Sequence, residues 1–224
     1  MGKRAKILLH RDNQSSVLFL SQKSLYVEIC VFGQDGPPNA VQDGIFMLKL
    51  GVIGTSKKEN ERRVPLHPDH LSRIPENVRR QLIFEQGYGE PFGISDSDLA
   101  SQVGGIATRS ELLADLGVVV LPKPKVEDLK TLRKGGILWG WTHCVQQRAL
   151  TQVAIERKQT LIAFEEMFVW GPDGHVGLHT FYKNNEFAGY CGVLHALQLK
   201  GIDGNYGDQR KTIIVSFGAV SRGA

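Results

Sequence analysis

Short apolar runs recur between residues 48 and 164, and loops or amphipathic stretches separate each run from the next. Two of these runs, 116–121 and 136–141, are almost continuously apolar, which is typical of strands buried on both faces. Helical patterns lie between most neighbouring runs, and strands that alternate with helices predict a parallel α/β sheet. The predicted strands are 48–53, 81–85, 116–121, 136–141 and 160–164.

Helix signals occupy the segments between and after these runs. Ser95 is followed three residues later by Asp98, which is close to the capping-box pattern of a helix start. The stretch 188–201 is strongly helical, with apolar residues on one face and a glycine, Gly201, to end it. We interpret it as a hinge between a catalytic half and a cofactor half. Other helices are predicted from residue 68, at 110–115 and at 149–157, with a hairpin turn at 171–174.

The segment 211–224 begins with a lysine, continues as a β-branched run and ends in a turn that contains glycine. This pattern predicts the first strand and the phosphate turn of a dinucleotide-binding βαβ unit, where glycines let the backbone approach a pyrophosphate. The G-x-G-x-x-G fingerprint is altered, because serines replace its first and third glycines; a serine hydroxyl can also donate to phosphate. The cofactor-binding candidates in the C-terminal part are Gly189, Ser216, Gly218, Ser221 and Gly223.

A complete unit of this kind needs a further strand and helix, and its ribose-binding acid would follow about 20 residues later. We therefore interpret the chain as the front part of a nicotinamide-dependent enzyme with an incomplete cofactor domain. The expected fold class is α/β, with a parallel-sheet, Rossmann-like catalytic domain. The expected organisation is a leader at 1–46, a substrate domain at 47–186, a hinge helix and linker at 187–210, and the start of the NAD(P)-binding domain at 211–224.

The leader contains two strand-like runs, 16–20 and 25–32, and then a stretch rich in glycine, proline and asparagine. Met47 follows and opens what reads as the natural first strand of a domain. We expect Met47 to be the functional start, with a genuine extra β-hairpin in the leader as the alternative.

Composition narrows the class of protein. Hydrophobic residues make up 42% and charged residues 22% of the 224 residues, which are ordinary globular values. The net charge of +4 comes from basic residues that are scattered or paired with acids, which argues against a nucleic-acid-binding surface. Cys30, Cys144 and Cys191 lie far apart without metal-like spacing, which argues against disulfides and a zinc site. No apolar run approaches the roughly 20 residues that span a bilayer, so we expect a cytoplasmic protein with no membrane partner.

Chemically active side chains follow four of the predicted strands. Arg63 lies in the loop after the first strand, Lys123 follows the third, His143 the fourth and Glu165 the fifth. Because ligands of open α/β sheets bind at the carboxyl ends of the strands, we expect these side chains to converge in one cleft. A guanidinium, an amine, an imidazole and a carboxylate at successive strand ends indicate a reaction site.

Five motifs that carry these residues share their order and spacing with a known superfamily. They are Glu-Arg-Arg-Val-Pro-Leu at 61–66, Pro-Lys-Pro-Lys at 122–125, Gly-Trp-Thr-His at 140–143, the Glu165 region, and Phe-Ala-Gly-Tyr-Cys-Gly-Val-Leu at 187–194. Over about residues 48–224 the chain resembles the superfamily of alanine dehydrogenase, the transhydrogenase nucleotide-binding subunit and saccharopine dehydrogenase. The Gly-Trp-Thr-His and Ala-Gly-Tyr-x-Gly-Val-Leu motifs most resemble those of the N5-(carboxyethyl)ornithine synthases.

The resemblance implies a role for each site residue. Arg63, or Arg62 if the register differs by one, would grip the substrate carboxylate through its planar fork of donors. Lys123, with Lys125 as the weaker candidate, would bind the keto acid and exchange protons at the amine, since burial and neighbouring cations lower a lysine pKa. His143 would protonate the carbonyl or imine side as hydride arrives. The structural alternatives are a surface ion pair, a solvated amine and a satisfied core imidazole.

The remaining polar and aromatic residues of these motifs receive weaker roles. Glu165 resembles the acid that receives the second amino group in saccharopine-type enzymes, and Glu166 or a merely solvated loop is the alternative. Trp139 and Trp141 are expected to flank the pocket but are assigned to strand packing. Cys144 is not expected to act as a nucleophile, because the saccharopine enzymes carry a similar His-Cys pair without using it covalently.

The resemblance implies reductive amination or its reverse. A keto acid such as pyruvate would condense with an amino acid, and NADH or NADPH would deliver hydride to the imine carbon, giving an opine-type oxidoreductase that acts on CH–NH bonds. The alternatives are a non-catalytic keto-acid-binding module and alanine dehydrogenase-type deamination. A transhydrogenase-like role would need a membrane partner, to which no motif points. Only small-molecule partners are implied, and a homo-oligomer is compatible with this assignment.

Overall fold

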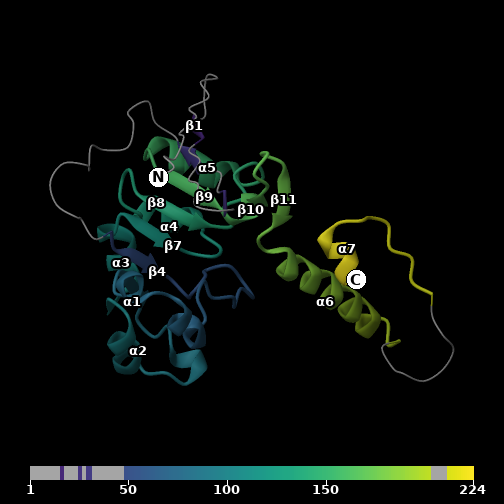
Figure 1. The fold of residues 1–224 in the computed structure, drawn as a ribbon, viewed down its shortest axis with the longest axis horizontal. Coiled ribbons are helices and arrows are strands. Elements are labelled where there is room, and N and C mark those ends of the chain that lie inside the picture. Colours follow the sequence, from purple (N-terminus) through teal and green to yellow (C-terminus); the bar gives the residue numbers. More distant parts are fainter. Residues whose placement is uncertain (1–15, 18–24, 27–28, 32–47, 203–210) are drawn as a thin grey trace. The chain divides into compact units, whose positions relative to one another are not determined.

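The computed structural model describes residues 16–17, 25–26, 29–31, 48–202 and 211–224 (Figure 1). The chain divides into two compact units, Met1–Glu166 and Met167–Ala224. No helix of the described residues is both long enough and apolar enough to cross a membrane.

The first unit is built on a sheet whose centre consists of six parallel strands. Their spatial order is β9-β8-β7-β4-β5-β6, so β4, the first along the chain, lies between β5 and β7. This is the order of doubly wound dinucleotide-binding folds, in which the chain reverses direction across the sheet between its first and fourth strands. The strands are β4 (Leu50–Val52), β5 (Leu82–Glu85), β6 (Gly105–Ala107), β7 (Val118–Val120), β8 (Ile137–Gly140) and β9 (Thr160–Ala163).

Hydrophobic side chains fill both faces of this sheet. Val52 and Ile53 are adjacent and fully buried, yet they belong to different clusters, because successive side chains of a strand point to opposite faces. One cluster contains Leu112, Leu129 and Leu150 from three helices. The other contains residues of the opposite face, among them Leu71, Phe84 and Leu99. The predicted parallel α/β sheet is therefore confirmed.

Helices and short 3-10 turns connect the strands. The predicted start at Ser95 is confirmed, since its Oγ accepts a hydrogen bond from the Asp98 N–H at 3.2 Å. Thr108 and Glu111 form a complete capping box at the start of α3. The elements are η1 (Pro68–Arg73), α1 (Glu76–Arg79), η2 (Glu90–Phe92), α2 (Asp96–Gln102), α3 (Arg109–Asp115), α4 (Val126–Thr131), α5 (Arg148–Glu156) and η3 (Phe164–Glu166).

The leader contributes strands to one edge of the sheet. Strand β3 (Ile29–Val31) pairs antiparallel with β9, and β1 (Ser16–Val17) pairs antiparallel with β3. Another short strand, β2 (Leu25–Tyr26), lies within the second predicted run. The predicted start at Met47 lies outside the described residues.

The described residues of the second unit, 167–202 and 211–224, form a hairpin and two helices. Strands β10 (Phe168–Trp170) and β11 (Val176–His179) pair antiparallel around the predicted turn, where the Gly171 N–H donates to the His175 carbonyl at 2.9 Å. Helix α6 (Tyr182–Leu199) begins six residues earlier than predicted and packs against the short helix α7 (Ala219–Gly223).

The predicted strand at the start of the segment 211–224 is not formed. Residues 211–217 have no regular secondary structure, and the apolar side chains of Ile213, Val215 and Phe217 are exposed. A strand exists only by hydrogen bonding to a neighbouring strand, and no described residue pairs with this segment. The glycine-bearing turn is followed, as predicted, by a helix.

Candidate active site

Four predicted site residues lie at the carboxyl ends of strands in the first unit. Arg63 belongs to the loop after β4, Lys123 follows β7, His143 follows β8 and Glu165 lies in η3 directly after β9. Parallel strands present these ends at one edge of the sheet, so the fold delivers the four side chains to a common region.

Lys123 and His143 are in direct contact. The Lys123 Nζ lies 2.7 Å from the His143 Nε2, so these two atoms share a hydrogen bond whose direction depends on the histidine tautomer. At this distance one nitrogen must donate and the other must accept, so the two nitrogens cannot both carry a proton directed at each other. The contact makes them a single proton-handling pair.

Trp141 brings Arg63 to this pair. The Arg63 Cζ lies 4.2 Å from the centroid of the Trp141 ring, and the Lys123 Nζ lies 5.3 Å from it. Cations at these distances are attracted to the negative face of an indole ring. The tryptophan therefore serves as a common platform for two positive groups that would otherwise repel each other.

Arg63 is also held by Glu61, two residues earlier in the same loop. Its Nε and Nη2 atoms donate to the two carboxylate oxygens at 2.7 and 2.5 Å, and its backbone N–H donates to the same group at 3.0 Å. These hydrogen bonds keep the pKa of Glu61 below its usual value. The sequence left two alternatives for Arg63, a surface ion pair and a place in the site. The structure shows both, since Arg63 pairs with Glu61 and also faces Trp141. Its neighbour Arg62 is exposed as well, so the contacts with Glu61 and Trp141, and not burial, distinguish Arg63.

Glu165 fixes the backbone of His143. One carboxylate oxygen accepts the His143 backbone N–H at 2.5 Å and lies 3.7 Å from the imidazole Nδ1. His143 has a left-handed backbone, with φ of 46°, which is unfavourable for a residue with a side chain and is found disproportionately at functional sites. The glutamate thus holds the histidine at its backbone and on the Nδ1 side, while Lys123 contacts Nε2.

The surroundings lower the pKa of both bases. Burial lowers the pKa of Lys123 most, the cations Lys58 and Arg63 lower it further, and the acids Glu61 and Glu165 oppose them. Burial is also the largest cause of the lowered pKa of His143, followed by the positive charge of Lys123. A partly buried amine that loses its proton more easily than a free lysine is suited to general acid–base chemistry near neutral pH.

The alternative residues lie elsewhere. Lys125 precedes α4, where its backbone N–H donates to the Asp128 carboxylate at 2.8 Å. Glu166 is exposed, in contrast to Glu165. The Cys144 thiol donates to the Thr142 hydroxyl at 3.4 Å. The contacts of Lys125 and Cys144 give these two residues structural roles outside the Lys123–His143 pair.

Sequence reasoning missed the part that Trp141 plays. Both tryptophans were assigned to strand packing, and both do pack edge-on against Phe164, with ring centroids 5.9 and 5.0 Å away for Trp139 and Trp141. Trp141 additionally faces the two cations. Its place directly after the end of β8, two residues before His143, was the available signal.

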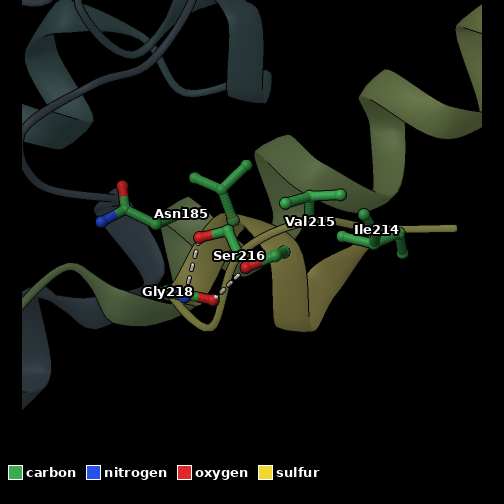
Figure 2. Close-up of a pocket in the computed structure, with 9 residues that line it drawn as sticks. Asn185, Ile214, Val215, Ser216 and Gly218 are labelled. Carbon is green, nitrogen blue, oxygen red and sulfur yellow. Dashed lines mark hydrogen bonds between the residues drawn. The ribbon is translucent and has the colours of Figure 1, made fainter.

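The predicted cofactor residues lie in the second unit. Ser216, Gly218 and Ser221 line a pocket of about 440 Å³, together with residues such as Asn185 and Ile214 (Figure 2). The Ser216 Oγ accepts the Gly218 N–H at 3.3 Å, and the Ser221 Oγ donates to the Gly218 carbonyl at 2.9 Å. These bonds give the turn before α7 a defined shape, with serine hydroxyls at its rim.

Gly189 and Gly223 lie where α6 and α7 cross. A Cβ atom on Gly189 would come within 1.8 Å of the Val220 carbonyl oxygen, and one on Gly223 within 1.7 Å of the Glu186 carbonyl oxygen. In this structure the two glycines therefore permit close helix packing.

The chain is similar in sequence to known dehydrogenases and synthases. The chain is 29% identical over 196 residues to an N(5)-(carboxyethyl)ornithine synthase of Clostridium botulinum, a match that covers 79% of this chain and 57% of that protein. It is 31% identical over 153 residues to an alanine dehydrogenase of Mycobacterium tuberculosis, covering 66% of this chain and 40% of that protein. The match thus spans little more than half the length of the ornithine synthase and less than half that of the alanine dehydrogenase.

Solved structures share the fold. An L-alanine dehydrogenase matches 71% of this chain and 43% of its own, with a TM-score of 0.53 and 21% identity. A transhydrogenase from Sinorhizobium meliloti matches 66% of this chain and 44% of its own, with a TM-score of 0.52 and 14% identity. The family model described as "Alanine dehydrogenase/PNT, N-terminal domain" matches residues 52–171, which is more than half of the chain. The chain therefore belongs to the alanine dehydrogenase/PNT family.

Proposed function

We propose that this chain forms the substrate-binding half of an NAD(P)-dependent oxidoreductase that joins a keto acid to the amino group of an amino acid. The observation that carries the proposal is the 2.7 Å contact between Lys123 and His143, with Arg63 held over the same indole ring as Lys123. An anion-binding guanidinium beside a paired amine and imidazole suits a small keto acid, whose carboxylate and carbonyl are adjacent.

Each residue then has a defined task. Arg63 binds the keto-acid carboxylate, which competes with Glu61 for the guanidinium. As the C=N bond forms, the attacking amine gives up two protons, and the Lys123–His143 pair passes them across its hydrogen bond to the keto oxygen, which leaves as water. Glu165 keeps the imidazole aligned through the His143 backbone.

The residues near α7 partly fit a nicotinamide dinucleotide. Ser216, Gly218 and Ser221 offer hydroxyls and backbone beside an open pocket and would hold its pyrophosphate. When bound, NADH or NADPH supplies the hydride that reduces the imine. Lys123 and His143 supply and withdraw the accompanying protons.

Alanine dehydrogenase-type chemistry, with ammonium in place of the amino acid, is the second candidate. The alanine dehydrogenase relative, at 31% identity, favours it. The ornithine synthase relative matches a larger share of this chain and favours an amino acid as the amine. A binding module without turnover is the remaining alternative.

Two measurements test the proposal. Calorimetric titration with pyruvate should give binding that Arg63→Gln weakens about tenfold or more, since one bidentate charged contact is lost, while Arg73→Gln, in η1, leaves it unchanged. The chain fused to the nucleotide-binding half of an ornithine synthase relative should then oxidise NADPH or NADH with pyruvate and ornithine or lysine. Turnover with ammonium alone would favour the alanine dehydrogenase type. Pyruvate binding without turnover would favour the binding module, and the absence of both would refute the proposal.

A further inference from the structure

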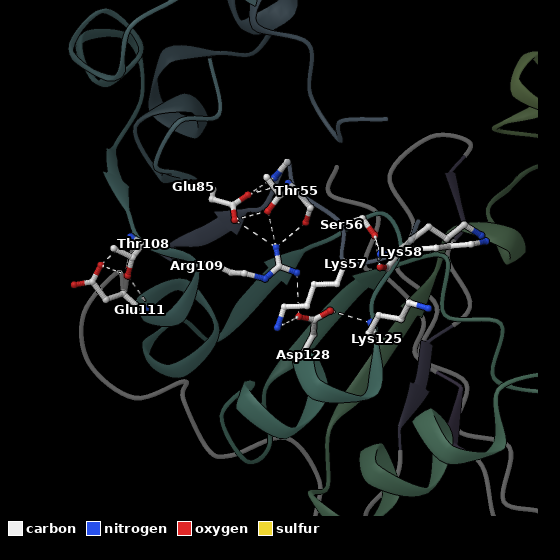
Figure 3. Close-up of polar contacts among 12 residues, drawn as sticks. Thr55, Ser56, Lys57, Lys58, Glu85, Thr108, Arg109, Glu111, Lys125 and Asp128 are labelled. Atoms are coloured by element: carbon white, nitrogen blue, oxygen red, sulfur yellow. Dashed lines mark hydrogen bonds and ion pairs between the residues drawn. The ribbon is translucent and has the colours of Figure 1, made fainter. Parts of the chain in front are cut away.

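A group of polar and charged side chains joins the loop after β4 to the first turn of α4 (Figure 3). We call Thr55, Glu85, Arg109 and Asp128 the Arg109 network. The side chain of Asp128 is fully buried, that of Glu85 is 7% exposed and that of Arg109 is 18% exposed. The proposed mechanism uses none of these residues.

The capping box of α3 fixes the start of this helix and with it the position of Arg109. The Glu111 carboxylate accepts the Thr108 N–H at 2.8 Å, and Arg109 is the first residue of the helix. Its Nη1 donates to the Thr55 carbonyl at 2.6 Å and to the Thr55 hydroxyl at 2.9 Å, while its Nη2 donates to the Asp128 carboxylate at 3.0 Å. One guanidinium thus joins the loop after β4 to the first turn of α4.

The two acids of the network hold the loops that follow β4 and β7, one each. Glu85, at the end of β5, accepts the backbone N–H groups of Gly54 and Thr55 at 3.0 and 2.9 Å. Asp128 accepts the backbone N–H of Lys125 at 2.8 Å. Because β4 and β7 are neighbours in the sheet, the loops that follow them start side by side, and Arg109 ties their anchors together.

The loops also meet at Lys123 itself. The Ser56 hydroxyl donates to the Lys123 carbonyl at 2.9 Å and accepts the Lys58 backbone N–H at 3.1 Å. Ser56 directly follows Thr55, whose carbonyl Arg109 holds. A chain of bonded groups therefore runs from Arg109 through Thr55 and Ser56 to the backbone of Lys123.

We propose that Arg109 is a positioning residue that sets the placement of Lys123 against His143 by clamping the two loops. A partly buried guanidinium with two carboxylate partners tolerates few alternative geometries: the buried Glu85 pairs with Arg109 at 3.3 Å, and Asp128, which Lys57 also approaches at 3.8 Å, pairs with it at 3.0 Å. Arg109 itself contacts neither Lys123 nor His143, so its effect passes through the loops. The inference rests on the proposed function only in taking Lys123 as the side chain that transfers protons.

Arg109→Lys is the decisive variant, because it keeps the charge and removes the fork that joins Thr55 to Asp128. Loosened loops admit water to Lys123, and burial is the main cause of its lowered pKa. The midpoint of the pH profile for chemical modification of Lys123, followed by mass spectrometry, should rise by about half a pH unit. The charged groups around the amine, namely Lys58, Glu61, Arg63, His143 and Glu165, stay unchanged in this variant.

Ser56→Ala provides a second route to the same result, since it cuts the last link to Lys123 without touching a buried charge. Arg80→Lys is the matched control: its guanidinium also binds two backbone carbonyls of the first unit, those of Ser101 and Val103, but away from the site. Arg109→Lys and Ser56→Ala should raise the midpoint, and Arg80→Lys should not. Added guanidinium should partly restore the wild-type midpoint in Arg109→Ala.

A variant series in which melting temperature falls while the Lys123 profile stays constant would overturn the inference and leave Arg109 with a purely structural role. This readout needs neither keto acid nor cofactor. A failure of pyruvate binding in the wild-type chain would therefore count against the proposed function and leave the inference on Arg109 standing.

Discussion

At the scale of single residues, the left-handed backbone of His143 is the costliest feature of the candidate site. A φ of 46° costs a residue other than glycine about 1–3 kcal/mol. Glu165 offsets this cost by accepting the backbone N–H, and Lys123 occupies the far side of the ring. The unfavourable backbone of His143 thus coincides with the contact between its imidazole and the Lys123 amine.

His143→Asn should make the folding free energy less dependent on pH. Asparagine tolerates the left-handed region, so the backbone is preserved. The pKa of His143 is lowered in the folded chain. The unfolded chain therefore binds more protons as pH falls below the ordinary histidine value of about 6.5, and the wild type loses stability in that range.

Urea unfolding at pH 7.5 and pH 5.5 checks this expectation. The wild type should lose more stability between the two values than His143→Asn does, by less than about 1 kcal/mol because the side chain is 35% exposed. His175→Asn, in the exposed hairpin turn, is the control and should behave like the wild type. Equal losses in all three proteins would show that the depressed pKa contributes nothing to folding.

The polar residues of the site could be anticipated from the sequence because strand ends are recognisable. Arg63, Lys123, His143 and Glu165 each follow an apolar run, and the fold brings them together. The roles assigned to them stay predictions. The cation–π contacts of Trp141 were not predicted, since such contacts join residues far apart in sequence and leave no periodic pattern; the position of Trp141 beside His143 was the signal that the sequence offered.

At the scale of elements, strands that lie within buried apolar runs were predictable and strands without such a run were not. All five predicted strands of the parallel sheet are present. Strand β6 was missed because it begins with glycine, is only partly buried and lies in no apolar run. Residues 211–217 were predicted as a strand from their β-branched character, which expresses a preference for a packed, paired surface that the described residues do not supply.

The crossing of α6 and α7 permits a sharp test at this scale. Gly189→Ala should force the helices apart, since the new Cβ would overlap the Val220 carbonyl oxygen. Hydrogen exchange in residues 219–223 should then accelerate by an order of magnitude or more, as expected for a loss of at least about 1.4 kcal/mol of local stability.

Gly192→Ala is the matched control, because it lies in the same helix with no heavy atom within 4 Å of its added Cβ. It should slow exchange slightly, since alanine stabilises a helix interior by about 1 kcal/mol relative to glycine. Similar exchange in both variants would mean that α7 does not pack at Gly189 in solution.

At the scale of the whole molecule, the residues of the candidate active site lie in the first compact unit, and the turn before α7 lies in the second. Every contact among Arg63, Trp141, Lys123, His143 and Glu165 is made within the first unit. Both hydrophobic clusters of the sheet are also formed by residues before 166. The serine- and glycine-containing turn lies in the second unit. A proton-handling site with its own core does not depend on that turn for its geometry.

Residues 1–166 should therefore fold alone and keep the paired bases. Expressed without residues 167–224, this segment should unfold cooperatively, and the midpoint of Lys123 modification should stay within about 0.3 pH units of that in the full chain, which corresponds to about 0.4 kcal/mol. The full chain is the reference. His143→Asn removes the imidazole Nε2 next to the amine, so this substitution should shift the midpoint by the same amount in residues 1–166 and in the full chain. A folded segment whose Lys123 titrates like a free lysine would show that the second unit is needed to close the site. In that case the pairing of Lys123 with His143 would be a property of the whole chain, and the Arg109 clamp would have to act together with residues 167–224.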